Sequence, residues 1–159
     1  MDQTAIMRRV IELSRAAVDG RHGGPFGAAV VKDGAIVAEA HNEVIARTDP
    51  TAHAELLAVR RACSALGTVN LSGCVLYTNG SPCSMCMASM LWAKLDHVHF
   101  ILEMKDSEAI GLGDAEFYQE LGRPVAERSI VPISRLPLLA DEARSVYRAW
   151  FEDPARVQF

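Results

Sequence analysis

The chain has 159 residues and a formal net charge of −4, from 16 basic and 20 acidic side chains. This length is most simply one domain, residues 1–159, and it is large enough to bury a core without disulfide support. The acidic balance is a poor match for nucleic acid, so we expect a small neutral ligand instead. The chain has no apolar run of the roughly 18 residues that a membrane helix needs. It also has no basic-then-apolar start, so we expect a cytoplasmic protein without membrane contact.

The first elements are predicted to be a helix and a hairpin. Residues 4–19 place apolar side chains at helical spacing, and a glycine-rich turn follows them. Two short β-type runs, 28–32 and 35–40, flank Asp33-Gly34, a dipeptide typical of a tight hairpin turn. We therefore expect an amphipathic helix and then two antiparallel strands.

Helices and strands are predicted to alternate over residues 51–102. The expected elements are a helix over 51–66 capped by Gly67, a strand over 74–77, a helix over 81–94 and a strand over 98–102. This alternation predicts parallel pairing, with the first two strands as an antiparallel edge. Further on we expect a loop over 106–113, a short helix over 116–121, an edge strand over 130–133 and a helix over 140–151. Together these elements predict an α/β fold with a mixed five-stranded sheet.

The stretch Ser81–Ala88 carries the clearest chemical signal. Pro82 suits the first position of a helix, with Ser81 as its cap, so Cys83 and Cys86 are expected on one face of the first turn. The positive end of the helix dipole favours their thiolate forms. Such a pair offers two ligands to a metal, although on its own it is also typical of a redox couple.

A second stretch, Thr51–Glu55, completes the set of ligands. His53 with two cysteines gives three ligands, which is the number that catalytic zinc sites use while a fourth position stays open for water. Glu55 follows two residues after the histidine. It is placed to act as a base beside the metal.

His-x-Glu followed by Pro-Cys-x-x-Cys resembles the signature of the zinc-dependent cytidine deaminase superfamily. The stretches Gly24–Ala28, His41-Asn42, Asp49–Glu55 and Tyr77-Thr78 are most similar to the branch that acts on free bases, and within it to bacterial guanine deaminases. The resemblance covers nearly the whole chain and is strongest between Gly24 and Trp92. It implies a three-layer α/β/α cytidine-deaminase-like fold with helices on both faces of the sheet.

The resemblance also implies an activity and a set of site residues. One zinc ion per subunit would activate hydroxide, Glu55 would carry protons, and guanine would become xanthine plus ammonia. The residues that it assigns to substrate binding are Asn42, Phe26, Ala54, Asp114, Trp92 and Ser81. By residue type alone, Asn42 reads as a turn residue and both Phe26 and Trp92 as core.

Two departures from the family pattern leave other substrates open. Ser81 stands where guanine deaminases usually carry glutamate, as in fungal cytosine deaminases, and the chain ends in Phe159 where a tyrosine can close the site. Cytosine, an aminated triazine such as ammeline, isocytosine or a pterin are therefore alternatives. A tRNA-adenosine deaminase and a structural zinc completed by a fourth ligand such as His41 are less favoured readings. A homodimer is expected, with residues 140–159 as a candidate lid or exchanged segment.

Overall fold

The computed structural model describes residues 1–158, so the C-terminal Phe159 lies outside the described residues. The chain divides into two compact units, Met1–Ala115 and a second one that begins at Glu116. The first unit contains the sheet and all of the predicted metal ligands. Within the described residues, no helix is long and apolar enough to cross a membrane.

The sheet of the first unit has four strands in the order β2-β1-β3-β4. Their bounds are Gly27–Lys32 for β1, Ala35–His41 for β2, Cys74–Thr78 for β3 and His97–His99 for β4. β1 is antiparallel to both β2 and β3, and only β3 and β4 run parallel. An isolated parallel bridge between Gly80 and Leu102 extends the contact beyond β4.

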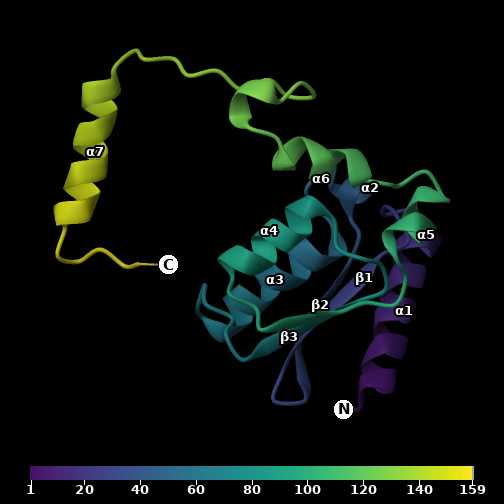
Figure 1. The fold of residues 1–159 in the computed structure, drawn as a ribbon. Coiled ribbons are helices and arrows are strands. Elements are labelled where there is room, and N and C mark those ends of the chain that lie inside the picture. The colour runs from purple at the N-terminus through teal and green to yellow at the C-terminus, as the bar shows by residue number, and fades with distance from the viewer. Residues whose placement is uncertain (159) are drawn as a thin grey trace. The chain divides into compact units, whose positions relative to one another are not determined.

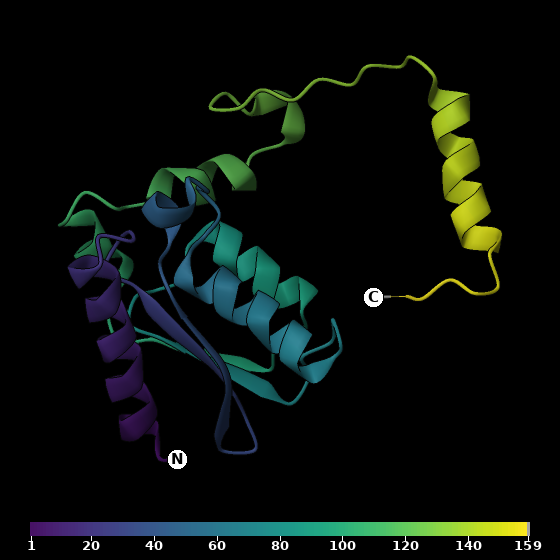
Figure 2. The same cartoon turned by 180° about the vertical axis from the view of Figure 1, so that it is seen from behind.

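The first unit has three layers, because side chains along each strand point alternately to the two faces of the sheet and helices cover both faces. On one face, α1 (Gln3–Asp19) packs Ile6 and Val10 against Ala29, Val31 and Tyr77 of the sheet. Figures 1 and 2 show α1 on one side of the sheet and the helices α3 and α4 on the other. Because strand side chains alternate between faces, the neighbouring positions contribute to the opposite core. The predicted α/β fold with helices on both faces is confirmed.

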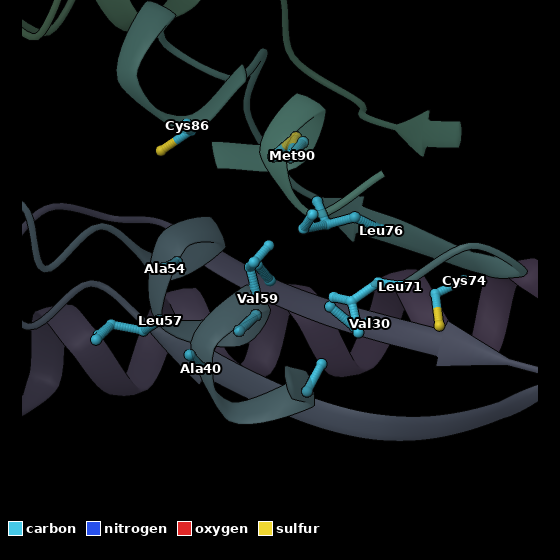
Figure 3. Close-up of a cluster of buried hydrophobic side chains, with 14 of the residues drawn as sticks. Val30, Ala40, Ala54, Leu57, Val59, Leu71, Cys74, Leu76, Cys86 and Met90 are labelled. Carbon is cyan, nitrogen blue, oxygen red and sulfur yellow. The ribbon is translucent and has the colours of Figure 1, made fainter. Parts of the chain in front are cut away.

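The larger core lies between the sheet and the helices α3 (Ala54–Leu66) and α4 (Ser84–Trp92). Figure 3 shows Val30 and Leu76 of the sheet facing residues of these helices, among them Val59 and Met90. Cys86, a predicted metal ligand, belongs to the same buried cluster. The ligand end of α4 is therefore anchored directly in the core, which limits how far its side chains can move.

Two of the predicted turns are confirmed. Asp33 and Gly34 join β1 to β2 with positive φ angles of 50° and 77°, as expected for a tight hairpin turn. Gly67 ends α3 with a φ of 64°, the left-handed conformation that glycine adopts without strain.

The remaining elements are helical. The first unit also contains the short helices α2 (Val44–Arg47) and α5 (Met104–Glu108), and α6 (Ala115–Gly122) begins at its last residue. The 3₁₀ turn η1 (Val125–Glu127) and α7 (Ala140–Glu152) belong to the second unit. α6 and α7 agree with the predicted helices, whereas α5 extends into residues 106–113, which were predicted to be a loop. The carboxylate of Glu120 accepts hydrogen bonds from the backbone N–H groups of Ser129 and Ile130. This side chain ties the end of α6 to the segment that follows η1.

The prediction of a fifth strand is wrong, because residues 130–133 form no strand in the structure. The backbone N–H of Ile130 is used by Glu120, and Pro132 has none to offer, so two of the four positions cannot donate to a ladder. The expected parallel pairing holds for β3 and β4 only. β1 inserts antiparallel between β2 and β3, because the hairpin turn reverses the chain before α3 crosses the sheet.

Candidate metal centre and active site

The predicted zinc ligands lie at the starts of two helices. His53 is the N-cap of α3, and Cys83 is the N-cap of α4 with Cys86 three residues later. The prediction that Pro82 occupies the first helical position behind a Ser81 cap is wrong. The cap is Cys83 itself, whose Sγ accepts a hydrogen bond from the backbone N–H of Cys86 at 3.5 Å. The cysteine therefore sits where the helix dipole favours a thiolate most strongly.

These three residues come together as the sequence predicts. His53 Nδ1 is 3.5 Å from Cys83 Sγ and 3.7 Å from Cys86 Sγ. All three ligand atoms lie within 4.8 Å of one another. One imidazole nitrogen and two sulfurs at this spacing fit a zinc ion, which takes such donors at about 2.0 to 2.3 Å in a tetrahedral arrangement.

The candidate cluster of metal-binding side chains found in residues 1–158 has three members. His41, named as one example of a fourth ligand in the structural-zinc alternative, instead hydrogen-bonds through Nε2 to His22 Nδ1 at 2.8 Å. Three protein donors with one open position are the pattern of a catalytic zinc site rather than of a closed structural one.

Hydrogen bonding between the ligands separates their proton affinities. The Cys86 side chain hydrogen-bonds to the Cys83 sulfur and, with the His53 ring, lowers the pKa of the Cys83 thiol to about 4. The same contact, together with burial and the nearby Glu55, raises the pKa of Cys86. The hydrogen bond to Cys83 also raises the pKa of His53. Cys83 is thus the ligand most readily available as a thiolate.

Glu55 is the second residue of α3 and is only 4 % exposed. Its Oε1 accepts a hydrogen bond from the Thr78 hydroxyl at 3.4 Å, and its Oε2 lies 3.7 Å from Cys86 Sγ. Burial raises the pKa of this carboxyl group above its usual value. A carboxyl group with a raised pKa beside a metal site is suited to taking up a proton and releasing it again.

Asn42 directly follows β2 and is buried. Its Oδ1 accepts hydrogen bonds from the backbone N–H groups of Gly24 and Val44, both at 3.2 Å. These bonds satisfy the acceptor end of the amide. The Nδ2 group, for which we find no partner within residues 1–158, is the end that remains for a ligand.

Phe26 is partly buried and is packed between two glycines. A Cβ atom at Gly24 would lie 3.1 Å from the Phe26 ring, and one at Gly80 would lie 3.0 Å from it. The missing side chains at these positions therefore make room for the ring. This close packing fits an apolar wall as well as a core residue.

Asp114 is brought to the start of α4, where its Oδ2 accepts a hydrogen bond from the backbone N–H of Ser84 at 3.2 Å. Burial raises the pKa of its carboxyl group. Ala54, buried, is the first residue of α3 and stands between His53 and Glu55. Asp114 and Ala54 are thus adjacent to the metal ligands, along the chain or through a hydrogen bond.

The structure places the other two predicted residues differently. The backbone N–H of Ser81 donates to Leu102 O at 2.7 Å, so Ser81 belongs to the segment that leads into α4. Trp92 is the last residue of α4 and is 72 % exposed, at the end of the helix opposite to Cys83. Its expected place in the core is wrong, and the structure does not bring it to the ligands.

The sequence analysis gave no site role to two polar residues of this region, although one of them, Thr78, belongs to the Tyr77-Thr78 stretch that carries the family resemblance. Thr78 contacts Glu55, and Asn79 contacts the backbone on both sides of Phe26. Thr78 is the last residue of β3, and Asn79 directly follows the strand. Polar residues at the carboxyl end of a central strand are a usual sign of a site in α/β proteins, and this signal was available.

Comparison with known families agrees with this geometry. The model of the cytidine and deoxycytidylate deaminase zinc-binding region matches residues 1–102. The chain belongs to this family of zinc-binding deaminases. The match includes His53, Cys83 and Cys86, so the family predicted from the motif is confirmed, and with it the expectation of zinc.

Similar proteins extend the match beyond the family region. Guanine deaminase of Bacillus subtilis (strain 168) is 41% identical over 150 residues, 94% of either chain. The X-ray structure of guanine deaminase from Bacillus subtilis matches with a TM-score of 0.93 at 38% identity, covering 100% of this chain and 99% of that one. A tRNA-specific adenosine deaminase of Aquifex aeolicus is 46% identical over 76 residues, 48% of this chain and 50% of that protein. This deaminase is thus a homologue of guanine deaminase over nearly its full length.

Proposed function

We propose that this deaminase hydrolyses a free nucleobase, with guanine converted to xanthine and ammonia as the leading reaction. The observation that carries the proposal is the group His53, Cys83 and Cys86 with the buried carboxyl group of Glu55 beside it. The similarity to Bacillus subtilis guanine deaminase over 94% of both chains supports guanine as the base.

Zinc held by these three residues would act as a Lewis acid that lowers the pKa of water and so supplies a nucleophile near neutral pH. Deamination also requires that protons reach a ring nitrogen and the departing amine. Glu55 is placed to hold and transfer them, because burial raises the pKa of its carboxyl group above the usual value and so favours uptake of a proton. The Thr78 hydroxyl, which donates to Oε1, orients the carboxyl group.

The surrounding residues suit a planar base with polar edges. Asn42 would donate from Nδ2 to an acceptor atom of the base, because its Oδ1 is occupied by two backbone N–H groups. Asp114 would accept from an N–H group of the base, and Phe26 would form an apolar wall. Guanine carries a carbonyl acceptor, ring N–H groups and the amine to be removed. It therefore fits this set of donors and acceptors.

Ammonia release from guanine by the zinc-loaded protein tests this function. We expect turnover of guanine to exceed that of cytosine, adenine, ammeline, isocytosine, pterins and the corresponding nucleosides. Glu55→Gln should keep its zinc and lose activity by roughly 100-fold or more, since general acid–base groups contribute about 10²–10⁴-fold. The exposed Glu116→Gln is the matched control. Full turnover by pure Glu55→Gln protein would refute the mechanism.

The same assay separates the alternatives. A preference for cytosine or a triazine would keep the chemistry and assign the difference to Ser81 and its neighbours. Tight, salt-sensitive binding of tRNA without turnover of free bases would favour a tRNA-adenosine deaminase. The net charge of −4 argues against that outcome.

We also propose a cytoplasmic homodimer whose C-terminal segment, residues 140–159, covers a site or is exchanged between subunits. Support comes from α7, where Val146, Tyr147 and Phe151 are all more than half exposed. Apolar side chains along one helix are usually covered by a partner. Sedimentation of a monomer at micromolar concentration would refute the dimer.

A further inference from the structure

We propose that Asn79 is a positioning residue for substrate binding, because its side-chain amide holds the backbone on both sides of Phe26. This inference rests on the proposed function for the role of Phe26 and Asn42. The clamp itself is seen directly in the contacts of the Asn79 side chain.

Both ends of the Asn79 amide are used. Its Nδ2 donates to the carbonyl oxygen of Pro25 at 2.9 Å, and its Oδ1 accepts from the backbone N–H of Gly27 at 2.8 Å. Asn79 lies 54 and 52 positions away from these two residues in the chain and is buried. A buried amide with both ends satisfied has one orientation, so it fixes the backbone of the intervening Phe26.

The clamp also reaches the predicted base-binding amide. The carbonyl oxygen of Phe26, between the two clamped residues, accepts a hydrogen bond from the backbone N–H of Asn42 at 2.9 Å. The Phe26 ring is confined from the other side by Gly80, where a Cβ atom would lie 3.0 Å away. Phe26, the proposed apolar wall, and Asn42, the proposed donor to the base, are thus both held through the side chain of Asn79.

The position of Asn79 links this pocket to the proton-transfer group. The preceding residue, Thr78, ends β3 and donates its hydroxyl hydrogen bond to Glu55. The Asn79 carbonyl oxygen accepts from the backbone N–H of Leu102 at 3.0 Å, so its own backbone is held as well. One rigid strand end therefore sets the distance between the base and Glu55. A site carried by a rigid element keeps its geometry better than one on a free loop.

Steady-state kinetics of Asn79→Ala on guanine tests this role. Loss of both hydrogen bonds releases the loop, so we expect KM to rise roughly 10-fold while kcat and zinc content stay within about twofold of wild type. Asn79→Asp keeps the acceptor for Gly27 and loses the donor to Pro25, and it should raise KM in the same way. Asn70→Ala is the matched control, because Asn70 also accepts a backbone hydrogen bond, from Ser72, but in an exposed turn.

A merely structural role would give the opposite pattern, with kcat reduced by loss of active protein and KM unchanged. That pattern, or unchanged kinetics in both Asn79 variants, would overturn the proposal. Amide hydrogen exchange provides a test that needs no turnover. Exchange at Gly27 and Asn42 should be at least several-fold faster in Asn79→Ala than in Asn70→Ala, and equal exchange would overturn the clamp. If wild-type protein does not deaminate guanine, the proposed function fails, while the exchange result still decides the clamp.

Discussion

Replacing Gly23 with alanine should displace Asn42, the residue expected to bind the base. A Cβ atom at Gly23 would lie 2.0 Å from Asn42 Oδ1 and 3.2 Å from the Asn42 carbonyl oxygen. No such contact is tolerated, so the Asn42 side chain must rotate away. It then loses the hydrogen bonds that it accepts from Gly24 and Val44.

The magnitude follows from these contacts. These two partly buried hydrogen bonds contribute roughly 0.5–1.5 kcal/mol each. The reduced freedom of alanine in the unfolded chain returns about 0.4–1 kcal/mol. We therefore expect Gly23→Ala to lower the free energy of unfolding by roughly 1–2 kcal/mol and to raise KM for guanine.

Urea unfolding followed by circular dichroism measures the change in stability, and ammonia release measures KM. Gly122→Ala is the matched control, because a Cβ atom there meets nothing within 4 Å. It should be neutral or slightly stabilising, since alanine is the better helix former. Wild-type stability and wild-type KM in Gly23→Ala would show that the close approach of Gly23 to Asn42 is not required.

Two further outcomes concern pH and the metal. The hydrogen bond from Arg9 lowers the pKa of the Glu39 carboxyl group. The pair therefore stabilises the fold fully at pH values above the pKa of glutamate in the unfolded chain, about 4.3. This stabilisation is lost as the pH falls through the pKa of Glu39 in the folded protein. Glu39→Gln should therefore be less stable than wild type at pH 7 by at most about 1 kcal/mol, because the pair is partly exposed. The difference in the free energy of unfolding between the two proteins should disappear towards pH 3. A difference that persists in acid would contradict this. Removing zinc with a chelator should abolish ammonia release and lower the melting temperature, since zinc binds the folded chain preferentially, and added zinc should restore both. Full activity in metal-free protein, verified by elemental analysis, would contradict this expectation.

Short-range signals explain what could be predicted of the fold. Helical spacing in residues 4–19, the Asp33-Gly34 turn and the Gly67 cap depend on neighbouring residues, and the structure confirms all three. Strand number and pairing depend on contacts between distant segments. The failed strand at residues 130–133 and the antiparallel insertion of β1 both belong to this second class.

The sequence by itself determined the chemistry of the centre. The motifs His-x-Glu and Pro-Cys-x-x-Cys specify the types of metal ligand and their spacing along the chain. To bring these ligands together, the fold only has to place the starts of two helices side by side. Only the tertiary structure decided how the residues around them are held. Asn79 meets Pro25 and Gly27 from more than 50 positions away, and Gly23 approaches Asn42 so closely that no side chain fits. Such contacts depend on how strands and loops pack in space, and no local pattern of residues encodes them.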